Sequence, residues 1–250
     1  NDLTAPTAAI TYSTTSPYNN TETVTIIATF NEAMADAAGV KIALSGAATL
    51  TATAMTKESA TEYRYSYTVP AGNGTQTVAL SVGTDVAGNA ITSAPSSGDT
   101  FVIDSTAPAD FTVAAVLTTG GTVVASKWNS TNTGVNVTVP VANDATLIGG
   151  TIKLRAKVDG EGYADLGSVR TIVAGDITAT NYTFSVSASD LEALSSGVAD
   201  AEEVIFTAII TDTGGTSTTG TQSGTTLTFD QTVPVISAIS ASWGTILNGI

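Results

Sequence analysis

Cysteine and histidine are both absent from the 250 residues of the sequence. Without cysteine the chain has no disulfide, no thiol nucleophile and no thiolate ligand for a metal. Without histidine it has no Ser-His-Asp triad and no imidazole ligand, so acid–base chemistry would fall to carboxylates, lysine or tyrosine. We therefore expect a protein that is not an enzyme. A small β-domain without disulfides also needs another form of stabilisation, for which a bound ion is one option.

Basic residues are scarce as well. The chain has 8 lysine and arginine residues against 22 aspartate and glutamate residues, which gives a net charge of −14. This balance excludes nucleic acid as a partner, because lysine and arginine are needed to neutralise phosphates. Hydrophobic residues make up 42% of the chain and charged residues only 12%, a composition that argues against disorder.

Long apolar runs are missing too. No stretch approaches the length of a membrane span, so we expect none in this segment. The first residues show neither the charged region nor the apolar region of a signal peptide. We therefore expect both ends to be cuts through a longer, repetitive polypeptide.

Three copies of the motif D-x-T-x-P divide the chain, at residues 2–6, 104–108 and 230–234. The second and third copies each follow a β-type run, and proline neither donates to a sheet ladder nor leaves its predecessor free to turn helical. The motif therefore predicts a short, stiff joint between modules. The expected organisation is a leading linker at 1–6, a first module at 7–104, a linker at 105–108, a second module at 109–230, and at 231–250 a linker with the start of a truncated third module.

Apolar residues alternate with polar ones along short segments of both modules. Val24, Ile26, Ala28 and Phe30 share one face of one such segment, and residues 135–141 repeat the pattern with four valines. Turn signals separate these segments about every ten residues, which is typical of an antiparallel sandwich. The sequence predicts an all-β fold of tandem immunoglobulin-like antiparallel β-sandwiches.

Two details of the second module depart from this pattern. Residues 189–194 predict a single helical turn, capped by Ser189 or Asp190. Pro140 falls inside a predicted strand, so that strand is expected either to lie at a sheet edge or to carry a bulge.

The motif D-x-A-G-N at residues 85–89, followed by a last strand and D-x-T-x-P, resembles the bacterial immunoglobulin-like (Big-type) repeats of very large surface proteins. These include biofilm-associated proteins and calcium-dependent repetitive adhesins. Residues 242–248 resemble the opening of such repeats, whereas the second module has Gly215 where the asparagine of the motif is expected. The resemblance implies cell adhesion, a location outside the cell or at the cell surface, and calcium at the junctions between modules.

Strand reversals also bring carboxylates together without reference to any family. In a seven-strand antiparallel sandwich, the loops after strands two and six return to the pole at which the chain enters. Residues 30–33 (Phe-Asn-Glu-Ala) and 142–145 (Ala-Asn-Asp-Ala) are aligned as the first of these loops in the two modules. The side chains expected to gather at the two joints are Asp2, Asn31, Glu32, Asp85 and Asn89 in the first module, and Asp104, Asn143, Asp144 and Asp212 in the second.

Carboxylates that converge in this way need relief from their repulsion, about 4 kcal/mol for a pair at 4 Å and an effective dielectric constant of 20. Ca²⁺ suits such oxygen ligands, and we expect one ion at each joint. An alternative reading needs no ion, because aspartate before a turn often caps backbone N–H groups and aspartate at the end of a last strand discourages edge pairing.

The second module also holds the most basic stretch of the chain, with Lys153, Arg155 and Lys157 on one strand face. A solvated outer face is expected there, with contact to an acidic copy as the alternative. The carboxylates Asp159, Glu161 and Asp165 are expected at a solvated hairpin tip, with an ion site as the alternative.

These features predict a structural and adhesive extracellular repeat segment of a large surface or secreted protein, whose modules are stiffened by calcium. The alternative is a self-assembling surface-layer or extracellular filament subunit. The expected partners are neighbouring modules, with other copies, or a cell-surface or polysaccharide target, as further possibilities. A polysaccharide-binding enzyme accessory is disfavoured because aromatic residues do not cluster.

Overall fold

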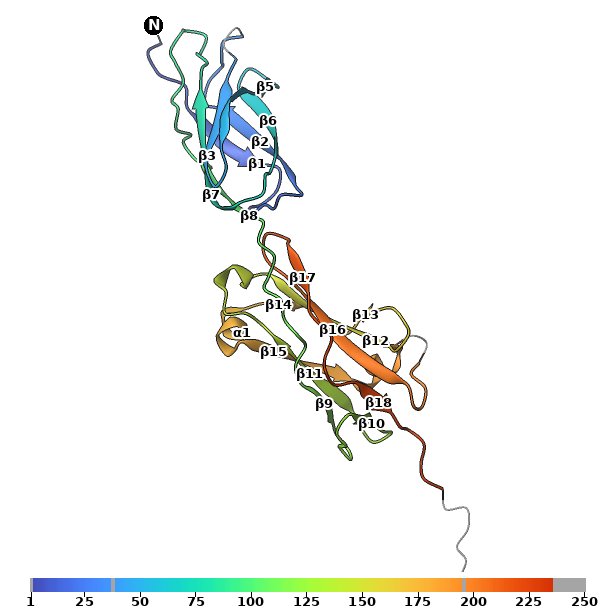
Figure 1. Cartoon of the computed structure of the whole chain (residues 1–250). Coiled ribbons are helices and arrows are strands. Elements are labelled where there is room, and N and C mark those ends of the chain that lie inside the picture. Colours follow the sequence, from blue (N-terminus) through green and yellow to red (C-terminus); the bar gives the residue numbers. More distant parts are fainter. Residues whose placement is uncertain (1, 37–38, 195–196, 236–250) are drawn as a thin grey trace, which may run out of the picture.

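A computed structural model describes residues 2–36, 39–194 and 197–235. The chain forms two β-sandwiches that follow one another end to end, with an extended linker between them (Figure 1). The fold is all-β and immunoglobulin-like, as the alternating sequence pattern predicted. The suggested opening of a third module lies beyond the described residues.

The first sandwich packs two four-stranded sheets. One has the order β1-β2-β6-β5 and the other the order β4-β3-β7-β8. The strands are β1 (Ala8–Tyr12), β2 (Thr23–Phe30), β3 (Lys41–Gly46), β4 (Leu50–Ala54), β5 (Thr56–Lys57), β6 (Glu62–Thr68), β7 (Asn73–Ser81) and β8 (Thr100–Asp104).

The second sandwich repeats this plan with insertions. A three-stranded sheet of order β15-β11-β9 faces a larger one of order β10-β18-β16-β12-β13, in which β14 also pairs with β12 and β17 with β16. The strands are β9 (Val116–Thr119), β10 (Lys127–Trp128), β11 (Gly134–Pro140), β12 (Thr151–Val158), β13 (Ala164–Asp165), β14 (Arg170–Thr171), β15 (Asn181–Ser187), β16 (Glu203–Thr211), β17 (Ser217–Thr219) and β18 (Leu227–Phe229). Short helices lie between them: η1 (Ala145–Leu147), α1 (Ala174–Ala179) and α2 (Ala188–Glu192).

Both sandwiches close in the same way. An early segment runs parallel to the last strand: Tyr18 forms a parallel bridge with Ile103 in the first sandwich, and β10 pairs in parallel with β18 in the second. The neighbouring strands are antiparallel. This shared arrangement makes residues of the two sandwiches comparable one by one.

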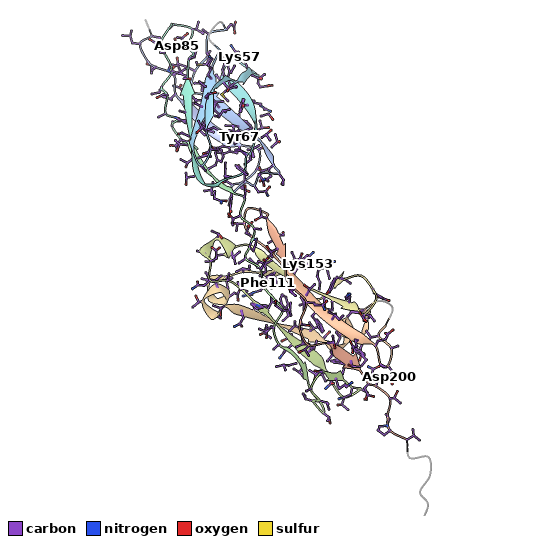
Figure 2. All side chains as sticks on the ribbon, in the orientation of Figure 1. Lys57, Tyr67, Asp85, Phe111, Lys153 and Asp200 are labelled. Atoms are coloured by element: carbon purple, nitrogen blue, oxygen red, sulfur yellow. The ribbon has the colours of Figure 1, made fainter. Side chains whose placement is uncertain are left out.

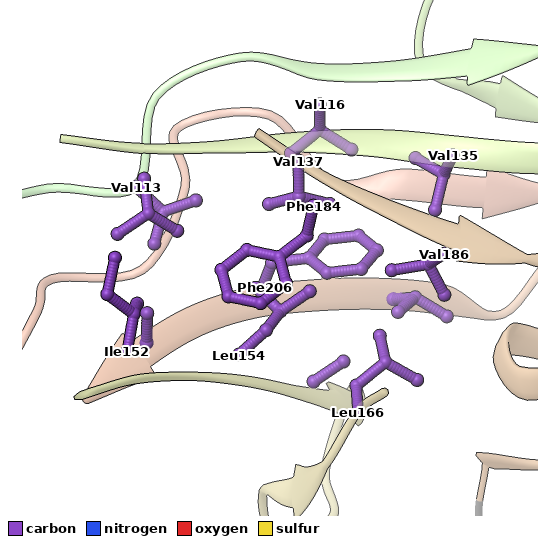
Figure 3. Packing of buried hydrophobic residues seen from close by; sticks show 14 of the residues in the cluster. Val113, Val116, Val135, Val137, Ile152, Leu154, Leu166, Phe184, Val186 and Phe206 are labelled. Carbon is purple, nitrogen blue, oxygen red and sulfur yellow. The ribbon is translucent and has the colours of Figure 1, made fainter. Parts of the chain in front are cut away.

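Each sandwich has its own hydrophobic core. The buried cluster of the first lies within residues 8–103 and that of the second within residues 113–229, and the two share no residue. Figure 3 shows the second core, where Phe184 from one sheet meets Phe206 and Leu154 from the other. The inward residues are the alternate apolar positions of each strand, because successive side chains of a strand point to opposite faces.

Two local expectations were wrong. Pro140 marks neither an edge strand nor a bulge, since β11 is the central strand of its sheet; the proline stands at its last residue, beyond the stretch that pairs with β9. The helical turn expected at residues 189–194 is present as α2, but it begins one residue earlier and its cap is Ser187, whose hydroxyl accepts from the Asp190 N–H at 3.2 Å.

In the described ranges, no helix combines the length and the apolar character that crossing a membrane requires.

Candidate metal centre

Three carboxylates meet at the N-terminal pole of the first sandwich, the end at which the chain enters it. Asp2 of the leading linker, Glu32 after β2 and Asp85 after β7 each offer one oxygen, and these oxygens lie within 4.8 Å of one another. Figure 2 shows Asp85 at the end of this sandwich that faces away from the second. The structure thus places these three predicted residues together, as the counting of strand reversals required.

Asp85 is held by the turn that it begins. Its Oδ1 accepts the Asn89 N–H at 2.8 Å and its Oδ2 accepts from Asn89 Nδ2 at 2.7 Å. Gly88 has a φ of 94°, which favours glycine at this place in the turn. Although burial acts to raise the pKa of the Asp85 carboxyl, the hydrogen bonds from Asn89 and the turn backbone outweigh it and lower that pKa.

The predicted asparagines support the site from outside the group of three. Asn31 Oδ1 accepts the Thr7 N–H at 2.8 Å, which ties the loop after β2 to the start of the sandwich. Asn89 Nδ2 also donates to the carbonyl oxygen of Asp2 at 3.3 Å. Asp2 Oδ1 in turn accepts the Thr4 N–H at 2.9 Å. The two asparagines therefore hold the linker and the loops in place.

The pKa of Glu32 reflects repulsion by the other two carboxylates of the cluster. The pKa of its carboxyl is raised above its ordinary value, first by loss of hydration and then by the negative charges of Asp2 and Asp85. A cation at this point would act in the opposite direction and favour the charged form.

The second joint is built differently. Asp104, Asp144 and Asp212 line a cavity of about 370 Å³ between the sandwiches. Among the described residues, however, the only group of three carboxylates close enough to share an ion is the one at Asp2, Glu32 and Asp85. Asn143 lies outside the cavity and lines a neighbouring hollow of about 340 Å³ beside Pro108.

Each carboxylate of the second joint accepts hydrogen bonds from its own neighbourhood. Asp212 Oδ1 accepts the Thr216 N–H at 2.9 Å, and Asp104 Oδ1 accepts the Thr106 N–H at 3.2 Å. Asp144 caps η1 through the Thr146 N–H at 2.9 Å. In this joint the three aspartates therefore accept hydrogen bonds from backbone N–H groups, as the alternative without an ion predicted.

A shift of one position explains why the poles differ. The N–H of Phe30 donates to Thr61 at 2.8 Å and that of Val141 donates to Thr180 at 3.0 Å, each carbonyl directly preceding the paired strand. Val141 is thus the equivalent of Phe30. It follows that Ala142 matches Asn31 and that Asn143 matches Glu32, so the second joint has an amide where the first has a carboxylate. The expected alignment of residues 30–33 with 142–145 was wrong by one.

The turns after β7 and after β16 also have to be realigned by one position. The Gly88 N–H donates to Asp85 O at 3.2 Å, and the Gly215 N–H donates to Asp212 O at 3.3 Å. Gly215 is therefore the equivalent of Gly88, and Thr216 is the equivalent of Asn89. The motif reads D-x-x-G-T in the second sandwich, and Gly215 does not displace the asparagine.

The basic strand face is partly exposed, and residues of its own sandwich contact it. Asp165 Oδ2 lies 2.9 Å from Lys153 Nζ, and its Oδ1 lies 3.4 Å from Arg155 Nε. The Tyr163 ring lies 5.3 Å from the ammonium of Lys157. Asp165 therefore belongs to the paired strand β13 and is not part of a solvated hairpin tip.

One contact between the sandwiches was missed in the sequence. Asn19 Nδ2 donates to the carbonyl oxygen of Gly214 at 2.6 Å, although the two residues are 195 positions apart. In the sequence Asn19 signals only a turn, and no local pattern shows that its side chain reaches the next sandwich.

No protein-family model and no curated protein matches the chain. Among solved structures, a marsupial T cell receptor is similar at 9% identity, with 88% of this chain and 97% of that one covered. The TM-score is 0.26, which is too low to carry an argument about function.

Proposed function

We propose that the chain is a structural and adhesive segment of a large extracellular surface or secreted protein, in which Ca²⁺ stiffens the pole where the chain enters a sandwich. The observation that carries this proposal is the meeting of Asp2, Glu32 and Asp85. The end-to-end order of the sandwiches supports it, because such an order gives reach along one axis (Figure 1). The resemblance to bacterial adhesin repeats points the same way.

The residues fit a calcium ion. Ca²⁺ binds oxygen at 2.3–2.6 Å, so two oxygens on one ion lie at most about 5 Å apart. The three oxygens, all within 4.8 Å of one another, meet that limit. Carboxylates are the ligands that Ca²⁺ prefers, and water completes a shell of six to eight oxygens. A bound ion would supply positive charge where three negative charges meet.

The ion would connect three separate parts of the chain. Asp2 belongs to the leading linker, Glu32 to the loop after β2 and Asp85 to the turn after β7. An ion shared by all three would fix the linker on the sandwich and limit its swing. The proposal therefore concerns the Asp2 pole, because the described residues of the joint at Asp104 form no equivalent group of three carboxylates.

Calcium is expected to raise the thermal midpoint of the first sandwich by about 6 to 20 °C. Extracellular calcium modules bind with dissociation constants of about 10⁻⁴ to 10⁻³ M, so 10 mM calcium contributes about 1.4 to 2.7 kcal/mol. Each kcal/mol shifts the midpoint of a small domain by about 4 to 8 °C. Calorimetry with calcium and with chelator measures the shift. Asp2→Asn should reduce it and Asp159→Asn, in an exposed loop, should not; equal midpoints with calcium and chelator would overturn the proposal.

Replacing Glu32 by glutamine is expected to change stability in opposite directions with and without calcium. The folded-state pKa of Glu32 is raised, so in chelator its contribution to stability is greatest at low pH and falls as pH rises from the ordinary glutamate pKa through the folded one. Glu32→Gln should therefore stabilise the protein at pH 7 in chelator and weaken the effect of calcium. Urea unfolding at pH 4 to 7 measures both, with Glu58→Gln, an exposed glutamate, as the control. A variant less stable than the parent in chelator at pH 7 would contradict the assignment.

A further inference from the structure

We propose that the two sandwiches are held in one relative orientation by a metal-independent latch, in which Asn19 at the C-terminal pole of the first binds the turn at residues 212–216 of the second. The donor is the Asn19 amide and the acceptor is the Gly214 carbonyl, at 2.6 Å. This inference stands apart from the calcium proposal, since it concerns the other pole of the first sandwich and needs no ion.

The first sandwich fixes the orientation of the Asn19 side chain. Its Oδ1 accepts the Thr21 N–H at 2.8 Å and also the Thr21 hydroxyl, while its own backbone N–H donates to Glu22 Oε2 at 2.9 Å. With the carbonyl side held in this way, the amide NH₂ points toward the second sandwich, where it donates to Gly214. With both sandwiches in contact the residue is only 8% exposed, so the hydrogen bond to Gly214 is largely shielded from water.

The second sandwich presents a turn shaped to receive the amide. Asp212 braces the turn through Thr216, and the Thr216 hydroxyl donates to the linker carbonyl of Thr106 at 2.9 Å. A Cβ on Gly214 would lie 2.9 Å from the Asp104 carbonyl oxygen, which leaves no room for a side chain. The turn therefore contacts both the linker and the first sandwich.

The turn equivalent to that of Asn19 lies at the C-terminal pole of the second sandwich and directs its amide differently. Asn129 occupies the position of Asn19: its Oδ1 accepts the Thr131 N–H at 3.0 Å, and its N–H donates to Asn132 Oδ1 at 2.8 Å. There, however, the amide donates within the sandwich, to Thr122 O at 2.7 Å. Asn19 thus differs from its equivalent in directing its amide toward the next sandwich.

Removing the donor is expected to raise the undocked fraction about fivefold, since one neutral hydrogen bond contributes about 1 kcal/mol. Asn19→Asp is the sharpest variant, because Oδ1 can still accept from Thr21 while the second oxygen cannot donate to Gly214. The matched control is Asn20→Asp, with the same change of charge at the exposed neighbouring residue.

Pulsed electron–electron double resonance measures the distribution of distances between two spin labels on the whole chain. The measurement is made in chelator, and the width of the distribution reports how well the orientation is fixed. The chain has no cysteine, so labels can be placed at exposed Ser66 and Ser168, one in each sandwich. We expect one narrow distance distribution for the parent and for Asn20→Asp, and for Asn19→Asp the same peak with an added broad component from the undocked fraction. Gly214→Ala tests the acceptor side and should broaden the distribution as well. The latch is refuted if Asn19→Asp and Gly214→Ala, both folded by circular dichroism, stay as narrow as the parent, or if the parent is itself broad. Because calcium is absent throughout, neither result bears on the metal centre.

Discussion

Phe206→Ala is expected to lower the free energy of unfolding of the second sandwich by about 3 to 5 kcal/mol. Phe206 lies on β16, is 0% exposed and belongs to the core that both sheets share (Figure 3). Close packing leaves the surrounding residues little freedom to fill the cavity that alanine would create. The loss is large against the total stability of a single domain.

The loss should be confined to the second sandwich, because the two cores share no residue. Trp128 is buried in the second core and stacks on Phe229, with ring centres 5.7 Å apart, so its fluorescence reports on that sandwich. Urea unfolding in a Trp243→Phe background should show the tryptophan transition moving to lower urea while the transition of the first sandwich stays. Phe101→Ala, in the first core, should move the transition of the first sandwich to lower urea and leave the tryptophan transition unchanged. A single transition displaced equally by both variants would show that the sandwiches unfold as one unit.

Asp212→Ala is expected to cost the second sandwich about 1.5 to 3 kcal/mol in the absence of calcium, the range for hydrogen bonds to a charged group. Asp212 is 5% exposed, and its Oδ1 accepts the Thr216 N–H at 2.9 Å. Alanine would leave the Thr216 N–H without its acceptor, whereas Asp212→Asn retains one acceptor oxygen and should cost less. Urea unfolding in chelator measures both losses.

Asp110→Ala, at an exposed aspartate of the same sandwich, is the control for removal of a negative charge. It should change stability by no more than about 0.5 kcal/mol. If Asp212→Ala proved neutral in chelator and destabilising only with calcium, Asp212 would act as a metal ligand and the account of it as a brace of the turn would be wrong.

Strand periodicity predicted most of the fold, because burial on one face imposes an alternation that a sequence displays directly. Val24, Ile26, Ala28 and Phe30 all lie inside the first sandwich, as expected. The meeting of Asp2, Glu32 and Asp85 was also predictable, since it follows from the number of strand reversals. The second joint was not, because one position decides whether a carboxylate or an amide follows the strand. That position depends on where β11 stops pairing with β15.

Features that depend on residues far apart in the chain could not be predicted from the sequence. The amide of Asn19 finds its acceptor only after both sandwiches have folded. Asp165 pairs with Lys153 and Arg155 because β13 adds to the edge of β12. From its place beside a Gly-rich loop, Asp165 was expected at a solvated hairpin tip. The cap of α2 differed by two or three residues, because Ser187, Ser189 and Asp190 all have side chains suited to capping and a local pattern does not distinguish them.

The parallel closing segments determine how a sandwich responds to tension. β10 and β18 run in the same direction, and the Thr228 N–H donates to Ser126 at 3.0 Å while the Asp230 N–H donates to Trp128 at 2.7 Å. In the first sandwich the Asp104 N–H donates to Tyr18 at 2.8 Å in the same arrangement. A pull on the two ends of the chain drags such segments past each other in opposite directions. The hydrogen bonds between them are then loaded together in shear and must break at once, so a module under tension yields more slowly than one whose strands peel apart bond by bond.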